Sequence, residues 1–393
     1  MSSTVVRRFD LRVDQGKALD DVRDLLRRLV AQESGIVHAQ IKRVEALSLL
    51  AVRLQGDSSA ISRVVAQVAG SPTLRIEHDA IRVAAPAEPE HLDPGRRGAL
   101  MRIGVEPGAW KAPVDPATSS PSVTVAIVDS GIMVDHPKLK DHVWTGMVDG
   151  GQAHGARCID GTRSRDVTDR DGHGTRLAGT ILSVTQGAPG VRLMAVKFFD
   201  ADHLPGPENG AAGIDFAVEQ HADIINLSWD LGMGSPALER AIQAAYDAGA
   251  LVVIAAGNSG TDNDVIPTIP ACYRKGREKR IITVMATDRY DDKASFSNYG
   301  IGTVDLAAPG VDLVTTRAAL TSASGIGARQ YHSFTGTSAA AATVSGAAAL
   351  LLSRDPSLSR DPRRTAEALK EQLTSSANPP RGLKCVYGRL NVV

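Results

Sequence analysis

Short apolar runs rich in β-branched residues alternate with longer amphipathic segments from about residue 99 to the end of the chain. Runs of this kind are typical of parallel strands buried on both faces, and they predict strands at Val123–Val128, Leu193–Phe199, Ile224–Leu227, Leu251–Ala255 and Ile281–Met285. The segments between and after them predict helices at Thr175–Val184, Gly210–Gln220, Pro236–Ala248, Ser338–Leu352 and Arg363–Ser375. This alternation predicts an α/β domain with a doubly wound, mostly parallel sheet and helices on both faces.

The first 85 residues carry a different pattern. Alternating apolar and polar residues predict strands at Thr4–Val13, Gly35–Val44, Leu47–Leu54 and Leu74–Val83. A helical period of apolar residues predicts one helix at Ala18–Gln32 and a second that begins at Asp57 or Ser58. The order βαββαβ is that of a small ferredoxin-like domain, a fold that by itself indicates no function.

A segment without periodicity separates the two patterns. Residues 86–98 are dominated by proline and charge, which is typical of an exposed linker and a natural place for proteolysis. We therefore expect three parts: a small domain at 1–85, a linker at 86–98 and a large domain at 99–393.

The composition mainly argues against certain classes of protein. Lys+Arg and Asp+Glu are both 44, and aromatic residues make up 4%, so nothing favours a nucleic-acid partner or a membrane surface. No apolar run approaches the roughly 20 residues that span a bilayer, and no signal peptide is visible. If the chain starts at its native residue, we expect a cytoplasmic protein. The three cysteines form no metal or disulfide pattern, so we expect free thiols.

Three separate motifs carry candidate chemistry. Asp129 ends the first strand of the large domain, in VDSGI, where a carboxylate can orient a histidine. His173 stands between Gly172 and Gly174, where a turn enters a helix. Ser338 follows Gly-Thr and opens a helix of small residues, whose positive end favours negative charge on a bound carbonyl oxygen. Each residue alone has a structural reading: a solvated acid, a structural histidine and an N-cap serine. Together they predict a Ser-His-Asp triad.

A fourth motif, GNSG, follows the buried strand at Leu251–Ala255. Asn258 lies within it between Gly257 and Ser259. An asparagine in such a turn can simply tolerate unusual backbone angles. Its side-chain amide can also donate to an oxyanion.

The motifs VAIVDSGI, DGHGTRLAGT, VVIAAGNSG and FTGTSAAAATVSGAAAL resemble those of the subtilases, the subtilisin-like serine endopeptidases, in residues and in chain order. The resemblance covers about Ala99 to the end. It implies that Asp129 orients His173, that His173 is the general base for Ser338, and that Asn258 and the Ser338 N–H hold the oxyanion. It implies hydrolysis of protein or peptide substrates through an acyl-enzyme, with no cofactor required for catalysis.

The N-terminal block resembles the propeptide of this family. The resemblance implies that it assists folding of the catalytic domain, inhibits it as an intramolecular plug, and is removed when the zymogen processes itself. The alternative is an accessory domain that stays attached.

The chain departs from the common family pattern at several positions. Ala339, Ala342 and Thr343 replace the usual Met and Pro-His after the serine, and Arg176 stands where a second histidine often follows the HGT motif. Lys138 occupies the place of an acidic residue in extracellular members, and the loop after the histidine helix is short. We therefore expect the common calcium site of the family to be absent, although other structural calcium sites remain open.

The resemblance also suggests where substrate binds. Asn226–Gly232 matches the family strand that pairs with the substrate backbone, with Ser228 and Trp229 in place and Asp230 where glycine is usual. Ala256 and Gly257 complete the predicted substrate-binding set. Asp230 favours a basic substrate side chain, or it is a solvated loop acid.

Cleavage after Arg97, before Gly98, would fit a preference for basic residues. The competing cut lies near Ala84–Ala85, where the last strand of the small domain ends.

Two other protein classes fit the sequence less well. A pseudoprotease would need a broken triad, and all four motifs are intact. A dinucleotide-binding protein would need a G-x-G-x-x-G turn after the first strand, which VDSGIMVDHP lacks.

Overall fold

The chain folds into two compact units, Met1–Pro89 and Glu90–Val393, and each has its own sheet. The computed structural model describes residues 4–13, 26–31, 36–44, 49–57, 74–83, 99, 102–105, 122–188, 190–200, 203, 205–231, 234–274, 281–318, 331–354, 362–378 and 382–392. The predicted linker at 86–98, with both candidate cleavage positions, lies outside the described residues.

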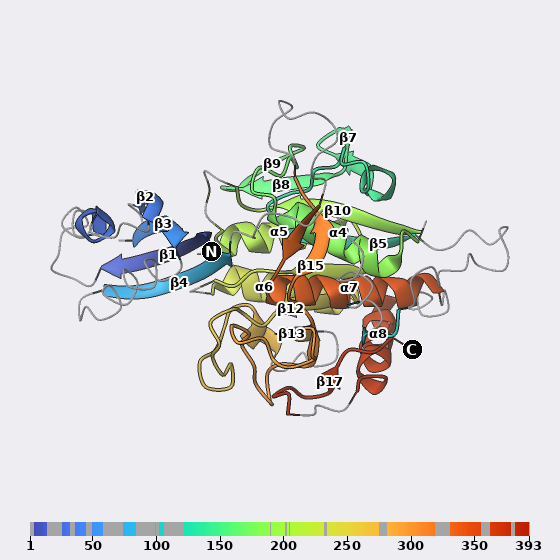
Figure 1. Ribbon diagram of the computed structural model, residues 1–393. Helices are drawn as coiled ribbons and strands as arrows, with labels where there is room; N and C mark the ends of the chain where they lie inside the picture. The colour runs from blue at the N-terminus through green and yellow to red at the C-terminus, as the bar shows by residue number, and fades with distance from the viewer. Residues whose placement is uncertain are drawn as a thin grey trace. The chain divides into compact units, whose positions relative to one another are not determined.

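The first unit contains a four-stranded antiparallel sheet (Figure 1). Its strands are β1 (Thr4–Val13), β2 (Ile36–Val44), β3 (Leu49–Asp57) and β4 (Leu74–Val83), in the spatial order β2-β3-β1-β4. Residues 26–31 form the end of the first predicted helix, and the second predicted helix lies outside the described residues. With β3 between β1 and β2 and antiparallel to both, this is the predicted split βαβ arrangement.

The second unit is built on a nine-stranded sheet among the described residues, in the order β17-β14-β13-β12-β11-β5-β10-β8-β9. The strands are β5 (Val123–Asp129), β8 (Gly155–Ile159), β9 (Thr162–Ser164), β10 (Val191–Lys197), β11 (Ile224–Leu227), β12 (Leu251–Ala255), β13 (Ile281–Thr287), β14 (Leu306–Pro309) and β17 (Gly388–Arg389). All pairs are parallel except β8–β9. The predicted mostly parallel sheet is therefore confirmed.

Helices cover both faces of this sheet (Figure 1). They are α4 (His173–Thr185), α5 (Pro207–Glu219), α6 (Pro236–Ala248), α7 (Thr337–Arg354) and α8 (Pro362–Ser375), with short 3₁₀ turns at Lys140–His142 and Ala271–Arg274. One core cluster joins one face of the sheet to α4, α7 and α8. A second cluster joins the other face to α5 and α6. In β5, Val125 and Ile127 enter the first core while Ala126 and Val128 enter the second, the alternation expected of a strand buried on both sides.

The five predicted helices and five predicted strands of this unit are all present, with ends shifted by a few residues. Helix α7 begins at Thr337, one residue before the predicted start. The short strands β8, β9, β14 and β17 were not predicted from the sequence. Two antiparallel hairpins were missed as well, β6 (Gly146–Val148) with β7 (Gly151–Ala153), and β15 (Leu313–Thr316) with β16 (Tyr331–Phe334).

Helix α7 is buried along almost its whole length, so it is a packed core helix and not a linker. The small residues of this helix, its alanines and Gly346, predict that it packs close to the sheet. The helix does contact the sheet, but Gly346 faces a different neighbour. A Cβ added at Gly346 would lie 2.7 Å from the Cβ of Val184 and 3.0 Å from the carbonyl oxygen of Ile181, both on α4. Gly346 therefore sets the approach of α7 to α4.

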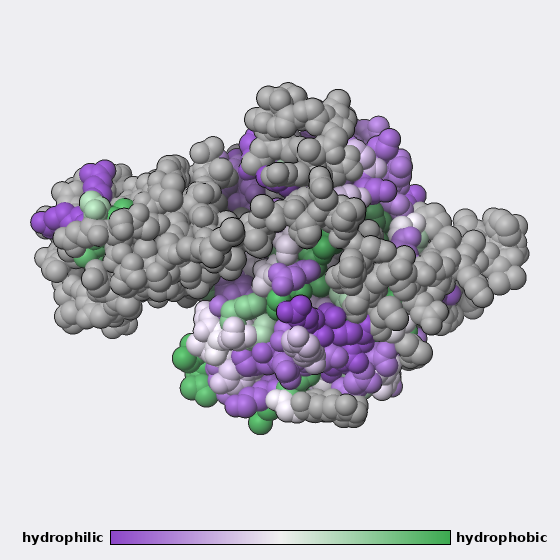
Figure 2. Space-filling view, viewed as in Figure 1, coloured by the Kyte–Doolittle hydropathy of each residue, from purple (hydrophilic) through white to green (hydrophobic). Residues whose placement is uncertain are grey.

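The described surface mixes polar and apolar residues (Figure 2). Its large exposed apolar side chains include Met147, Val265, Ile266 and Ile301. In the described part of the chain, no helix is long and apolar enough to cross a membrane.

We predict that Gly346→Ala lowers stability. Overpacking at such a contact costs about 1–3 kcal/mol, which exceeds the gain of at most about 1 kcal/mol from removing a helical glycine. Chemical denaturation of the intact chain measures the difference. Gly302→Ala is the matched control, because an added methyl there meets no atom closer than 3.4 Å. Equal stability of the two variants would contradict the proposed close contact.

Candidate active site

Asp129 is the last residue of β5, at the carboxyl end of a central strand of the sheet. Its carboxylate is fully buried. One oxygen, Oδ1, accepts hydrogen bonds from Nδ1 of His173 at 2.8 Å and from the backbone N–H of Ser130 at 2.8 Å. Functional groups gather at the carboxyl ends of strands in doubly wound sheets, so β5 places this acid where the topology predicts a site.

His173 is the first residue of α4, and the glycines beside it serve two purposes. Gly172 caps the helix with φ of +89°, a left-handed conformation that glycine adopts without strain. Gly174 passes so close to Gly131 that an added Cβ would lie 2.1 Å from the Gly131 carbonyl oxygen. This close approach brings the start of α4 against the end of β5, and with it the imidazole against Asp129.

Asp169 stabilises the same turn through hydrogen bonds. Its buried carboxylate accepts hydrogen bonds from the Ser130 hydroxyl at 2.9 Å, the Gly172 N–H at 2.6 Å and the Asp171 N–H at 3.1 Å. It also accepts from the N–H of Thr175 at 2.9 Å and the hydroxyl of Thr175 at 2.6 Å. Burial raises the pKa of Asp169, and the bonds from Thr175 and Gly172 oppose that shift. One carboxylate thus joins the residue after Asp129 to the helix that carries His173.

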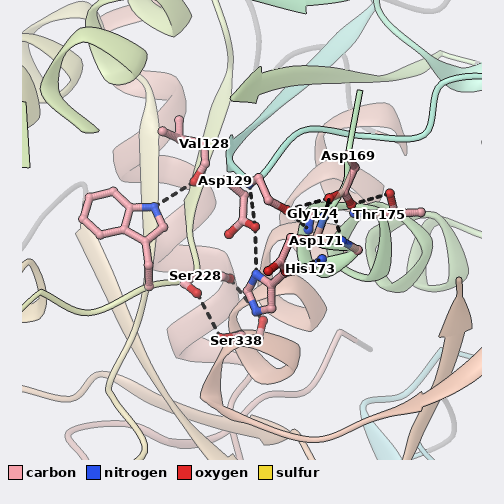
Figure 3. Close-up of polar contacts among 12 residues, drawn as sticks. Val128, Asp129, Asp169, Asp171, His173, Gly174, Thr175, Ser228 and Ser338 are labelled. Atoms are coloured by element: carbon pink, nitrogen blue, oxygen red, sulfur yellow. Dashed lines mark hydrogen bonds and ion pairs between the residues drawn. The ribbon is translucent and has the colours of Figure 1, made fainter. Parts of the chain in front are cut away.

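Ser338 is the second residue of α7, in the first turn, where backbone N–H groups have no acceptor within the helix. Figure 3 draws the imidazole of His173 between Asp129 and Ser338 in projection. Among the described residues, the Ser338 hydroxyl donates to the carbonyl oxygen of Ser228 at 2.9 Å and not to His173. The structure thus brings His173 and Asp129 together, while the Ser338 hydroxyl is turned toward Ser228. A serine hydroxyl rotates easily, and catalytic hydrogen bonds often tighten only when substrate is bound.

Asn258 follows β12, and its amide orientation is fixed by Thr337. The backbone N–H of Thr337, which can only donate, gives a hydrogen bond to Asn258 Oδ1 at 2.8 Å. The Thr337 hydroxyl donates to the same oxygen at 3.0 Å and accepts from the Gly257 N–H at 3.2 Å. Because Oδ1 is held against the start of α7, the amide nitrogen is the group that remains available for a ligand.

The predicted substrate strand leaves β11 at Ser228. The Ser228 Oγ donates to the Ser338 carbonyl at 3.1 Å. Together with the bond from the Ser338 hydroxyl to the Ser228 carbonyl, two hydrogen bonds join these residues. The side chain of Trp229 lies in the core beneath β5, where Nε1 donates to the Val128 carbonyl at 2.7 Å. Any contribution of Trp229 to substrate binding would therefore come from its backbone.

Ala256 and Gly257, the other two predicted substrate-binding residues, follow β12. Ala256 is buried, and its backbone bonds to β13 through Val284. A Cβ added at Gly257 would lie 3.2 Å from Oδ2 of Asp230 and 2.5 Å from Nδ2 of Asn298. The structure thus brings Asp230 beside the residue that precedes Asn258.

Asn298 organises the loop after Asn258, although nothing in the sequence indicated this role. Its side-chain oxygen accepts from the N–H groups of Ser259 and Thr261, and its nitrogen donates to Asn263 and Thr268. No motif distinguishes this asparagine, because its partners lie 30 or more residues away in the chain.

Neither metal ligands nor reactive thiols are apparent in the parts of the chain that the structure describes. No group of three or more His, Cys, Asp or Glu side chains there is placed to hold a metal ion. All three cysteines are free. Burial raises the pKa of Cys158 and of Cys385 to about 11, so both thiols stay protonated near neutral pH.

The chain is similar to known proteins in sequence and in fold. The thermophilic serine proteinase of Bacillus sp. (strain AK1) is 32% identical over 290 residues, which cover 72% of this chain and 63%, just under two thirds, of the relative. Subtilisin DY of Bacillus licheniformis is 36% identical over 264 residues, which cover 65% of this chain and 84% of the relative. A solved structure described as a lanthipeptide protease has the same fold, with a TM-score of 0.57 and 24% identity over 69% of this chain and 86% of that one. The family model described as the subtilase family (Peptidase_S8) matches residues 120–389, well over half of the chain. The chain therefore belongs to the subtilase family of subtilisin-like serine endopeptidases.

Proposed function

We propose that this chain hydrolyses peptide bonds with Ser338 as nucleophile, His173 as general base and Asp129 as the group that orients the base. The observation that carries the proposal is the buried 2.8 Å hydrogen bond between His173 Nδ1 and Asp129 Oδ1. A carboxylate only accepts hydrogen bonds, so Nδ1 bears the proton and Nε2 carries the free lone pair. An imidazole in this tautomer is ready to accept a proton from a serine hydroxyl.

Acylation begins when the Ser338 hydroxyl leaves the Ser228 carbonyl and donates to Nε2. As Oγ bonds to the substrate carbonyl carbon, its proton moves to Nε2, and the carbonyl oxygen gains negative charge. Asn258 Nδ2 and the Ser338 N–H stabilise this oxyanion. His173 then returns the proton to the leaving amine, and the C–N bond breaks. Water then attacks the acyl carbon while His173 takes its proton, and His173 returns a proton to Ser338 Oγ as the ester bond breaks and the acid product leaves. This proposed sequence uses groups of the chain and water, and it requires no cofactor.

We propose further that the chain is made as a zymogen whose N-terminal unit acts as an intramolecular inhibitor and folding aid. The segment after the linker supports a cut upstream of Arg102. Ile103 and Val105 are buried in the core of the second unit, and the Ile103 carbonyl accepts from the N–H of Val392. Arg102 and Arg389 both pair with Asp291, at 3.4 Å each. Removal of the N-terminal unit would therefore leave this segment on the catalytic unit.

Substrate preference is the third part of the proposal. We propose that substrate pairs as a strand with residues 228–230 and that Asp230 favours a basic side chain. The position of Asp230 supports the proposed preference, because its carboxylate lies beside Gly257, one residue before the predicted oxyanion donor Asn258. A carboxylate at that position attracts arginine or lysine and disfavours acidic side chains.

Labelling with a fluorophosphonate tests the nucleophile. The intact chain should be labelled at Ser338, and Ser338→Ala should not be labelled, while its kcat for a peptide substrate falls by about 10⁶-fold. Ser353→Ala is the matched control, because that serine lies on the same helix and, among the described residues, its hydroxyl bonds to the Leu350 carbonyl. Tryptic mass spectrometry identifies the labelled residue. Label on a different serine, or none on the wild type, would refute the assignment.

Intact mass measurement tests self-processing. Wild type should lose mass that matches a cut between Val83 and Gly98, while Ser338→Ala stays whole, because only the wild type has the nucleophile. N-terminal sequencing then locates the cut. A first residue of Gly98 supports recognition of Arg97, whereas a start near Ala85 excludes it. A labelled wild type that stays whole would show that the N-terminal unit is retained.

Paired substrates that differ only in one side chain test Asp230. Asp230→Asn should lower kcat/KM for a substrate with arginine before the cleaved bond by about 10–100-fold, the worth of a hydrogen-bonded charge, and leave a leucine substrate nearly unchanged. Asp247→Asn removes one carboxylate from the exposed end of α6 and serves as the charge control. An equal fall for both substrates would show that Asp230 supports structure and does not read the side chain.

A further inference from the structure

The imidazole of His173 packs against an aromatic ring that the proposed mechanism does not use. Phe334, the last residue of β16, lies with its ring centroid 5.5 Å from that of His173 and an interplanar angle of 81°. This edge-to-face arrangement is a favourable geometry for two aromatic rings. Phe334 is buried and belongs to the core shared by α4 and α7.

A guanidinium group holds the Phe334 ring from another side. The Cζ atom of Arg176 lies over this ring, 5.4 Å from its centroid, which is within the range of a cation–π contact. Arg176 is on α4, one turn after His173, so the helix that carries the imidazole also carries the contact to Phe334. Arg176 stands where many subtilases have histidine. In this structure its guanidinium contacts the same ring that packs against His173.

The hairpin that carries Phe334 is fastened to α4 near His173. The hydroxyl of Thr316 donates to the Thr175 carbonyl at 2.6 Å, and that of Thr315 donates to the Arg176 carbonyl at 2.7 Å. Both threonines are in β15, and the Leu313 end of that strand pairs with Phe334. The ring therefore has a fixed position relative to the first turn of α4.

His173 needs such a second contact because one hydrogen bond does not fix a ring. Among the described residues, the hydrogen bond of the imidazole is the one from Nδ1 to Asp129. Small changes in the two side-chain torsion angles that keep this bond still change where Nε2 points, and the Ser338 hydroxyl is bonded to Ser228 and does not restrain it. A packed aromatic neighbour limits these changes.

We propose that Phe334 and Arg176 are positioning residues for His173. Phe334 holds the plane of the imidazole so that Nε2 faces the serine, and Arg176 acts through Phe334 by lying over its ring. The inference rests on the proposed role of His173 as general base. Neither residue exchanges a proton with the substrate.

The test compares Phe334→Leu, Arg176→Met and the double variant, with kcat and KM measured on one small peptide substrate. Displaced catalytic groups can cost up to about 100-fold, so Phe334→Leu should lower kcat by about 10–100-fold. Arg176→Met should lower kcat by about 3–10-fold, because it removes the guanidinium over the Phe334 ring and leaves the ring itself in place. KM should stay within about threefold in both variants, since transition-state geometry and not binding is affected.

The double variant separates action through Phe334 from independent action. Its kcat should match that of Phe334→Leu within about twofold, because residues that act through one another are not additive. Phe334→Tyr keeps the ring and should restore kcat to within about threefold of wild type. Arg163→Met is the matched control, since Arg163 lies over Phe216 at 5.1 Å, on a different side of the sheet, and its loss should leave kcat unchanged.

Two outcomes overturn the inference. One is a Phe334→Leu enzyme with wild-type kcat. The other is an Arg176→Met substitution that lowers kcat by the same factor in the Phe334→Leu background as in wild type. Thermal unfolding of each variant is measured in parallel, and Phe334→Met replaces Phe334→Leu if the latter does not fold. The rate of fluorophosphonate labelling in wild type keeps the two proposals apart. A labelled wild type with unaffected variants refutes only the positioning role, whereas an unlabelled wild type refutes the triad itself.

Discussion

A buried hydrogen bond of 2.8 Å between His173 and Asp129 joins the start of α4 to the end of β5. The two residues are 44 positions apart in the chain, and the intervening segment forms two hairpins before it returns. Burial of Asp129 makes the bond costly to lose, because an unpaired carboxylate in the core is strongly disfavoured. The proposed tautomer follows from this contact, and the contact anchors the imidazole to the end of β5.

The other half of the site is organised from α7. Thr337 fixes the amide of Asn258, and Ser338 exchanges two hydrogen bonds with Ser228, so the first turn of one helix orients both β12 and β11 at their carboxyl ends. Each of these bonds joins a side chain to a backbone group, so each ties one motif to the main chain of another. The proposed donors for an oxyanion are therefore held in place without substrate, and electrostatic stabilisation of this kind depends on such preorganisation.

Local pattern predicted the central strands, the five helices and the motif residues, because buried parallel strands and helix starts have strong sequence signals. It did not predict what connects the motifs. Asp169 looked like one acid among several in TDRDGHG, yet it accepts five hydrogen bonds from Ser130 and the first turn of α4. Thr316 bonds to Thr175 across 141 positions, and no periodicity encodes that contact. The rotation of the Ser338 hydroxyl toward Ser228 is likewise decided by the folded environment and not by the order of motifs.

The spacing between the proposed base and nucleophile is set by two helices, since His173 opens α4 and Ser338 lies in the first turn of α7. These helices pack directly, and Gly346 allows the contact by leaving room for Val184 and for the backbone at Ile181. On another side α4 packs against β15. A Cβ added at Gly179 of α4 would lie 2.2 Å from Oγ1 of Thr316 and 2.6 Å from Oγ1 of Thr315. Well-packed interiors transmit small displacements because they contain few voids. Helix α4 is therefore held between α7 and the hairpin of Phe334, so the same small residues that close the core determine where the imidazole lies.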